Sequence, residues 1–232
     1  MVQQLSSRAK HCSCYPSRTS IRFSQAAQMN KLVVFVKAPR PGFVKTRLAA
    51  SVGEQAACAA YGKLVGKLLG RLAPLDGVEL CFAPDDAEAE VRPWLRRGWR
   101  LAPQGPGDLG ARLHRSFESA RTAGAERVVV IGSDCPDITV EDIQSAWAAL
   151  HSHHVVLGPA HDGGYWLVGL NAPRADLFDG IAWSTNSVLT QTVGRCRSAG
   201  LRVHLMRQLA DIDSEEDWHR FLQRAGQGGQ QD

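Results

Sequence analysis

Two segments of the chain are almost continuously apolar and rich in β-branched residues. They are residues 31–37 (KLVVFVK) and residues 127–132 (RVVVIG). A run of this kind, without the alternation of a half-exposed strand, is typical of a strand buried on both faces of a parallel sheet. Segments with helical spacing of apolar residues separate these strands from others. The pattern therefore predicts an α/β fold whose mainly parallel sheet is covered by helices on both faces.

The spacing of apolar residues and the positions of turn residues predict the remaining elements. Further strands are predicted at residues 78–83, 99–102, 155–158, 165–170 and 201–206. Helices are predicted from about 44 to 72 with a break near Gly53, and at 85–97, 109–123, 139–151, 186–199 and 214–224. Asp108 and Thr139 precede two of these helices and are residue types that cap helix N-termini. Together these elements predict a three-layer α/β/α sandwich.

The patterned part of the chain fits a single domain, which we place at residues 30–225. Residues 1–29 are rich in Ser, Gln and Arg and contain no acid. We expect a disordered tail or an over-extended start there, with an organelle transit peptide as the alternative. Residues 226–232 are rich in Gly and Gln and predict a frayed tail.

Composition and charge exclude several classes of protein. The chain has 232 residues, of which 44% are hydrophobic and 22% charged, and it contains no apolar run long enough to span a membrane. The net charge of +4 is accounted for by the basic residues in the first thirty positions, so the rest of the chain is formally neutral. A neutral domain disfavours a general nucleic-acid binder. We therefore expect neither a nucleic-acid nor a membrane partner.

The six cysteines form no CxxC pair and are widely spaced after the first two. This spacing argues against both a disulfide framework and a zinc site. Reduced, inert thiols and a cytoplasmic location are the expectation.

A basic segment follows the first strand. Residues 37–47 (KAPRPGFVKTR) contain Lys37, Arg40, Lys45 and Arg47 around a Pro/Gly turn that leads into a helix. Cations beside the free N–H groups of a helix start form a natural phosphate site, although a solvated basic turn is the plainer alternative. The glycine spacing does not match a Walker A loop, which disfavours a P-loop NTPase.

An acidic residue, Asp134, directly follows the most hydrophobic strand, within GSDCPD at 132–137. Ligands of parallel sheets bind at the carboxyl ends of strands, and Mg²⁺ or Mn²⁺ takes one or two carboxylates there together with substrate phosphates. Asp134 is therefore a candidate metal ligand, whereas Asp137 is interpreted as the start of a turn. Asp211 and Asp213, at i and i+2, would face one side of an extended chain and could complete the site. Ser214 and Asp217 resemble a capping box beside them.

A third polar segment, Asp162-Gly163-Gly164, lies between two predicted strands. Asp-Gly is a strong hairpin signal, so a plain turn is the alternative to a functional site.

The set of motifs, in order, resembles a known bacterial family. KAPRPGFVKTRLA, GPGDLGARL, GSDCPDI, GPAHDGGYWLVGL, IAWSTNSV and DIDSEED cover about residues 31–222. Together they resemble small GT-A-like transferases described as glycosyltransferases associated with radical-SAM and arsenosugar genes. A more distant similarity links the chain to the molybdenum-cofactor guanylyl- and cytidylyltransferases and to 2-phospholactate guanylyltransferase.

The resemblance implies a role for each matching position. Nucleotide and phosphate binding would fall to Lys37 and Lys45, with Arg40, Gly42 and Arg47 as weaker candidates and with Gly107 and Asp108 near the base or ribose. The divalent metal would be held by Asp134, with Asp211 or Asp213 as a second ligand. The acceptor side would be lined by Asp162, Gly163, Gly164, Tyr165, Trp183, Ser184 and Thr185. Two features depart from these families: KAPRPG replaces the usual Gly-rich loop, and a single acid replaces the Asp-x-Asp of many glycosyltransferases.

The sequence thus predicts an Mg²⁺- or Mn²⁺-dependent transferase that moves a glycosyl group from a nucleoside-diphosphate sugar to a small acceptor. Asp134 and Asp162 are its candidate catalytic residues, and Asp162 would orient or deprotonate the acceptor hydroxyl. The alternatives are a nucleotidyltransferase that releases pyrophosphate from an NTP, and a non-catalytic nucleotide-binding module. The oligomeric state is left open.

Overall fold

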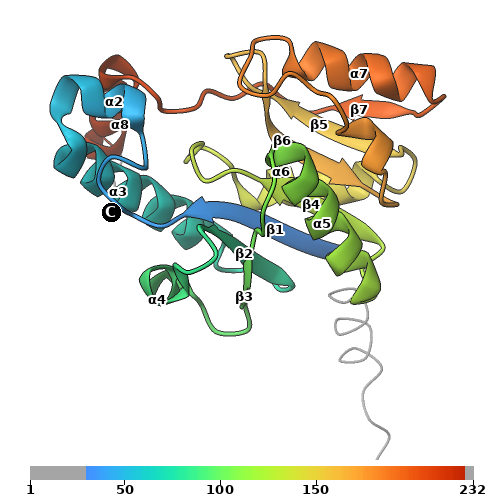
Figure 1. Ribbon diagram of the computed structural model, residues 1–232, viewed down its shortest axis with the longest axis horizontal. Helices are drawn as coiled ribbons and strands as arrows, with labels where there is room; N and C mark the ends of the chain where they lie inside the picture. Colours follow the sequence, from blue (N-terminus) through green and yellow to red (C-terminus); the bar gives the residue numbers. More distant parts are fainter. Residues whose placement is uncertain (1–29, 228–232) are drawn as a thin grey trace, which may run out of the picture.

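The computed structural model describes residues 30–227, which form one seven-stranded sheet with helices on both faces (Figure 1). The strands are β1 (Asn30–Lys37), β2 (Val78–Ala83), β3 (Arg100–Pro103), β4 (Arg127–Ile131), β5 (Val155–Pro159), β6 (Tyr165–Leu170) and β7 (Val203–Leu205). The helices are α2 (Thr46–Val52), α3 (Glu54–Leu72), α4 (Glu88–Val91), α5 (Leu109–Thr122), α6 (Val140–Ala149), α7 (Val188–Ser198) and α8 (Glu215–Gln227). Short 3-10 turns cover Arg92–Trp94 and Ala175–Leu177.

The strand order is β3-β2-β1-β4-β6-β5-β7. All pairings are parallel except the two made by β6, which runs antiparallel to β4 and to β5. The predicted mainly parallel sheet is confirmed. The reversal at β6 arises from the hairpin that the Asp162–Gly164 segment makes, where Gly163 has a φ of +88°.

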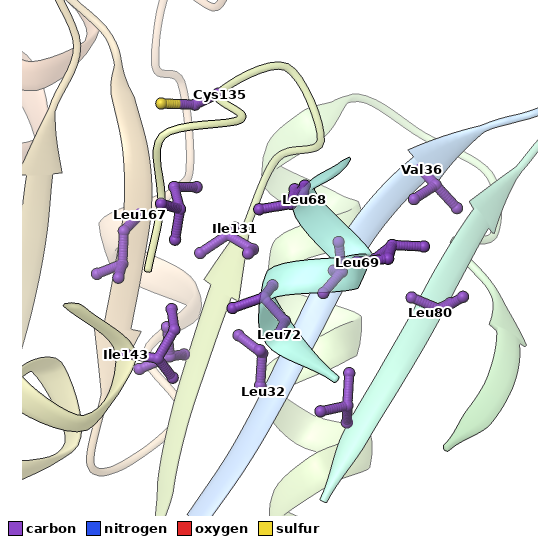
Figure 2. Packing of buried hydrophobic residues seen from close by; sticks show 14 of the residues in the cluster. Leu32, Val36, Leu68, Leu69, Leu72, Leu80, Ile131, Cys135, Ile143 and Leu167 are labelled. Carbon is purple, nitrogen blue, oxygen red and sulfur yellow. The ribbon is translucent and has the colours of Figure 1, made fainter. Parts of the chain in front are cut away.

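Two hydrophobic clusters, one on each face, hold the three layers together. On one face, Leu68, Leu69 and Leu72 of α3 pack over Leu32 of β1 and Ile131 of β4 (Figure 2). On the other face, side chains of α5 and α7 pack against the opposite sides of the same central strands. Because every one of the five residues named is at most 1% exposed, each contributes roughly 1.5–3 kcal/mol of burial free energy.

At one end of the molecule α8 lies beside α2 and α3 (Figure 1). Phe221 of α8 and Ile212 pack on Leu64 of α3 in a separate small cluster. This contact fixes the segment 210–213, which precedes α8, near the carboxyl ends of β1 and β4. The backbone N–H of Ile212 donates to the carbonyl of Asp134 at 3.2 Å.

Most predicted elements are confirmed within a few residues, including the helix break at Gly53. The predicted helix over 85–97 is wrong: α4 covers only Glu88–Val91, because a 3-10 turn containing Pro93 follows at once. The predicted helix over 186–199 begins at Val188, and α8 runs to Gln227. The expectations for residues 1–29 and 228–232 lie outside the described residues. Within residues 30–227, the helices are too short or too polar to cross a bilayer.

Candidate functional site

A cavity of about 470 Å³ opens at the carboxyl ends of β1 and β4, where the strand order changes direction. This is the place where ligands bind in open α/β sheets. Its walls include the ends of both strands, the beginning of β6 and the loop that leads into α5. The residues that line it include Lys37, Tyr61, Gln104, Gly107, Asp108, Arg112, Ser133, Asp134 and Tyr165.

Gln104 forms a polar wall of this cavity that sequence reasoning missed. Its amide nitrogen donates to the carbonyls of Val36 (3.1 Å) and Cys81 (2.9 Å). Because both amide protons are engaged, the amide oxygen is oriented towards Arg112, whose guanidinium donates to it at 3.2 Å. Arg112 also donates to the carbonyl of Gly107 at 3.0 Å. The only sequence signal for Gln104 is its position directly after β3 and before the glycine-rich loop.

The loop of residues 105–108, which precedes α5, contributes Gly107 and Asp108 to the wall of the cavity. Gly107 has a φ of +98°, a conformation that L side chains rarely adopt. Asp108 caps α5 by accepting the N–H of Ala111 at 2.9 Å. The loop and the first turn of α5 therefore present backbone groups at the mouth of the cavity.

Tyr61 of α3 joins the ends of β1 and β4. Its hydroxyl accepts the backbone N–H of Lys37 at 2.8 Å and lies 2.9 Å from the Ser133 hydroxyl. Burial, with the nearby charge of Asp134, raises the pKa of Tyr61, so the phenol stays protonated. Its proton is thus available to Ser133, and Tyr61 fixes the backbone on either side of the cavity. Sequence reasoning missed Tyr61, because it lies on the buried face of a helix and looks like a core residue.

Lys45 lies between two of the predicted metal ligands. Its ammonium is 3.2 Å from a carboxylate oxygen of Asp134 and 3.0 Å from one of Asp213, and its side chain is only 3% exposed. Burial alone would lower the pKa of Lys45, but the two carboxylates outweigh it and raise the pKa. Lys45 is therefore a buried cation. Its backbone is left-handed, with φ 49° and ψ 47°, where it precedes α2.

Asp211 completes a cluster of four carboxylates. Burial raises its pKa to about 7, and the charges of Asp134, Asp162 and Asp213 act in the same direction against the opposing effect of Lys45. The hairpin residue Asp162 and the segment 211–213 are thus brought together with the end of β4. We call Asp134, Asp162, Asp211 and Asp213 the carboxylate cluster.

The donor atoms of the carboxylate cluster are those that Mg²⁺ and Mn²⁺ prefer. Its surplus of negative charge, with Lys45 and the more distant Arg47 (3.5 Å from Asp213) as the neighbouring cations, also suits a divalent ion. Across residues 30–227, no three His, Cys, Asp or Glu side chains are arranged as a ready-made metal site. The ammonium of Lys45 separates Asp134 from Asp213. The residue types fit a hard cation.

Arg40, a predicted phosphate ligand, is engaged elsewhere. Its guanidinium pairs with Glu90 at 2.6 Å and with Asp86 at 3.3 Å, both from the segment after β2. Gly42 supports the turn before Lys45 with a φ of +80°, and a Cβ there would lie 3.2 Å from the carboxylate of Glu54. The structure therefore places these two residues beside the site rather than in the cavity.

The predicted acceptor-side residues form a corner next to the carboxylate cluster. Asp162 accepts the backbone N–H of Gly164 at 2.9 Å. Gly163 approaches the backbone of Asn186 so closely that a Cβ would overlap it, and its carbonyl accepts the N–H of Leu189 at 2.9 Å. The hairpin and the loop that carries Trp183, Ser184 and Thr185 are thereby locked together.

Two buried polar atoms in this corner have no hydrogen-bond partner within the described residues. They are the hydroxyl of Tyr165, which lies close to Thr192 of α7, and the indole nitrogen of Trp183. Unpaired buried polar groups are rare, and a bound ligand is one explanation for them. Thr185 instead donates to the carbonyl of Ala182 at 2.7 Å, and Ser184 has a left-handed φ of 63°. The last two residues therefore shape the loop.

Three comparisons place this architecture among known proteins. A crystal structure of a protein from Desulfovibrio desulfuricans G20, proposed to be a nucleotide-diphospho-sugar transferase, is 36% identical with a TM-score of 0.75, covering 80% of this chain and 83% of that one. The 4-diphosphocytidyl-2C-methyl-D-erythritol synthase of Anaerococcus prevotii DSM 20548 is 12% identical with a TM-score of 0.54, covering 84% and 99%. CMP:2-keto-3-deoxy-manno-octonic acid synthetase, solved with CTP, is 10% identical with a TM-score of 0.54, covering 86% and 99%. The last two likenesses show the fold alone. No curated protein matches the chain.

The fold is thus that of the nucleotide-diphospho-sugar transferase-like α/β proteins, as the sequence predicts. The family described as "Uncharacterized protein conserved in bacteria (DUF2064)" matches residues 71–185, and this chain belongs to it.

Proposed function

We propose that the protein is a divalent-metal-dependent transferase that moves a glycosyl group from a nucleoside-diphosphate sugar to a small acceptor. The observation that carries the proposal is the juxtaposition of a partly apolar cavity, a buried lysine and the carboxylate cluster at the carboxyl ends of β1 and β4. The 36% identical relative, itself proposed to be a nucleotide-diphospho-sugar transferase, supports the same class of donor.

The cavity suits the nucleoside part of the donor. Its walls combine apolar side chains such as Phe35 and Leu113 with the fixed polar groups of Gln104 and Arg112. Small-molecule sites have this composition, in which apolar surface supplies affinity and a few placed polar groups supply orientation. The diphosphate would then lie at the mouth, within reach of Lys45.

The carboxylates that would hold a divalent cation are Asp134, Asp211 and Asp213. When bound, Mg²⁺ or Mn²⁺ would neutralise negative charge that develops on the departing diphosphate. Lys45 would contribute a second positive charge to the same phosphates. These roles match the residue types, because hard cations prefer carboxylate oxygens and ammonium groups bind phosphates as point charges.

Asp162 is the residue we assign to the acceptor. One of its oxygens is held by the N–H of Gly164, and it is close enough to Asp211 to raise the pKa of that carboxyl. Asp162 would accept the proton of the acceptor hydroxyl as the oxygen bonds to the anomeric carbon and the nucleoside diphosphate leaves. The closed corner around Gly163 holds this carboxylate in place.

The test is a thermal-shift panel of nucleotide sugars and nucleoside triphosphates, each with Mn²⁺ or with EDTA, followed by product analysis. We expect metal-dependent stabilisation by a nucleotide sugar, about 2.7 kcal/mol at 100 times the Kd, and release of the nucleoside diphosphate on turnover. Asp134→Asn should abolish turnover, whereas Asp86→Asn, an exposed carboxylate outside the cluster, should not.

Two results would redirect the proposal. Pyrophosphate release from a triphosphate would make the protein a nucleotidyltransferase. Nucleotide binding without turnover, unaffected by EDTA, would make it a non-catalytic nucleotide-binding module.

A further inference from the structure

Lys45 cannot both pair with Asp134 and Asp213 and leave these carboxylates free to bind a metal ion. Its ammonium is bonded to Asp134 and Asp213, at 3.2 and 3.0 Å, and it is shielded from water. A divalent cation bound between Asp134 and Asp213 would lie against the carboxylate oxygens that the ammonium occupies. Because like charges at such separations repel strongly in a partly buried site, the ammonium and the metal cannot share these oxygens.

The nucleotide provides the alternative partner for the ammonium. Asp134 lines the cavity, and Lys45 is directly bonded to it, so phosphates at the cavity mouth lie next to the lysine. The side chain of Lys is a flexible four-carbon stem carrying a compact point charge, which can exchange a carboxylate for a phosphate by rotating its side-chain bonds. Its backbone need not move, since it is fixed at the start of α2.

We propose that Lys45 is the resident counter-ion of the carboxylate cluster, and that the phosphates of the nucleotide draw it away so that a divalent cation can take its place. This inference rests on the proposed function. It predicts that Lys45 opposes metal binding in the free protein and promotes it once nucleotide is bound. Each of the two ligands, nucleotide and metal, then increases the affinity for the other by more than their direct contact alone would produce.

A purely structural role for Lys45 predicts something different. If the lysine only ties Asp213 to Asp134, its removal would loosen the carboxylates and weaken metal binding. A counter-ion, by contrast, is a competitor, and its removal strengthens metal binding. The sign of the change therefore separates the two roles.

The experiment is calorimetric titration of Mn²⁺ into the full-length protein without nucleotide. Lys45→Met keeps the length and apolar stem of the side chain and removes its charge, and Lys45→Arg keeps the charge. We expect Lys45→Met to bind Mn²⁺ about tenfold more tightly than wild type, and Lys45→Arg to remain within about threefold of it. Lys63→Met, the same change at an exposed position of α3, should have no effect. An unchanged or weaker affinity in Lys45→Met would overturn the proposal.

Arg47→Met provides a second test in case Lys45→Met does not fold. Arg47 is 74% exposed and 3.5 Å from Asp213, so loss of its charge should tighten Mn²⁺ binding by only about two- to threefold. A weaker Mn²⁺ affinity in this variant would also count against the counter-ion role.

The coupling between ligands gives an independent readout. In wild type the nucleotide identified by the thermal-shift panel should tighten Mn²⁺ binding, and in Lys45→Met this enhancement should shrink by about the factor that the variant gains without nucleotide. Equal enhancement in both proteins contradicts the exchange. If no nucleotide binds wild type, the proposed function fails while the nucleotide-free Mn²⁺ titration still tests the counter-ion role.

Discussion

The hydroxyl of Tyr61 on α3 links the ends of β1 and β4 through hydrogen bonds, so removing it should lower the stability of the protein by a predictable amount. Tyr61→Phe deletes one oxygen atom from a side chain that is 2% exposed. The hydroxyl accepts the N–H of Lys37 at 2.8 Å and pairs with Ser133 at 2.9 Å. Both partners lose this hydrogen bond.

Each lost hydrogen bond contributes about 1 kcal/mol, so we expect the free energy of unfolding to fall by about 2 kcal/mol. For a domain of this size that corresponds to a decrease in Tm of roughly 4–8 °C. Urea denaturation of Tyr61→Phe and wild type measures the difference directly. The slope of unfolding against urea should be the same for both, because the surface exposed on unfolding is unchanged.

Ser133→Ala is the matched control, since it removes one of the two bonds and leaves the N–H of Lys37 paired with Tyr61. We expect it to cost about 1 kcal/mol and the double variant to cost about as much as Tyr61→Phe alone. Additive effects of the two substitutions, or a Tyr61→Phe protein within about 0.5 kcal/mol of wild type, would refute the coupling between the two hydroxyls.

The remaining predictions concern other parts of the molecule. Gly163→Ala should lower the free energy of unfolding in urea by at least about 2 kcal/mol, because its φ is +88° and a Cβ would overlap neighbouring backbone. The control is Gly194→Ala on α7, where the space around the Cα is open. It should be neutral or stabilising by up to about 1 kcal/mol. Burial would raise the pKa of Asp142, but hydrogen bonds from Arg207, at 2.7 Å, and from the backbone outweigh it and lower the pKa. Asp142→Asn should therefore cost about 1–2 kcal/mol at pH 7. The difference should start to shrink as the pH falls through about 4, the ordinary pKa of an unfolded Asp, and should disappear only below the lowered pKa of the folded protein. An equal difference at pH 3 and 7 would contradict this reasoning. Arg40→Met should change the nucleotide affinity measured by calorimetry by less than about twofold, because Arg40 is paired with Glu90. A tenfold loss of affinity would instead indicate that Arg40 contacts the phosphates.

The elements that the sequence predicts well are those whose burial is continuous. β1 and β4 are apolar along almost their whole length, and such runs have few alternatives to a central strand. The predicted helix over 85–97 fails because its pattern is interrupted by Pro93, and local propensity there is overridden by the chain's return to the sheet. Strand order is a different matter, since pairing of β6 with β4 depends on contacts between segments far apart in the chain.

The residues of the candidate site were easier to predict than the contacts between them. Residue types and strand ends were enough to select Lys45, Asp134, Asp211 and Asp213, and the structure brings all of them together. Sequence reasoning could not find Gln104, since a glutamine in a loop has no distinctive pattern.

The pairing of Lys45 with the carboxylate cluster follows from a general property of sites for charged ligands. A site that binds both phosphates and a divalent cation must carry fixed charges of both signs at neighbouring strand ends. Brought together by the fold, those charges pair with one another, as Lys45 does with Asp134 and Asp213. Leaving either sign unpaired in a half-buried place would cost more than the pairing. Ligand binding is then an exchange of partners, in which each ligand removes the other's competitor. That reasoning makes the sign of the Mn²⁺ response in Lys45→Met, rather than loss of turnover, the informative measurement on this site.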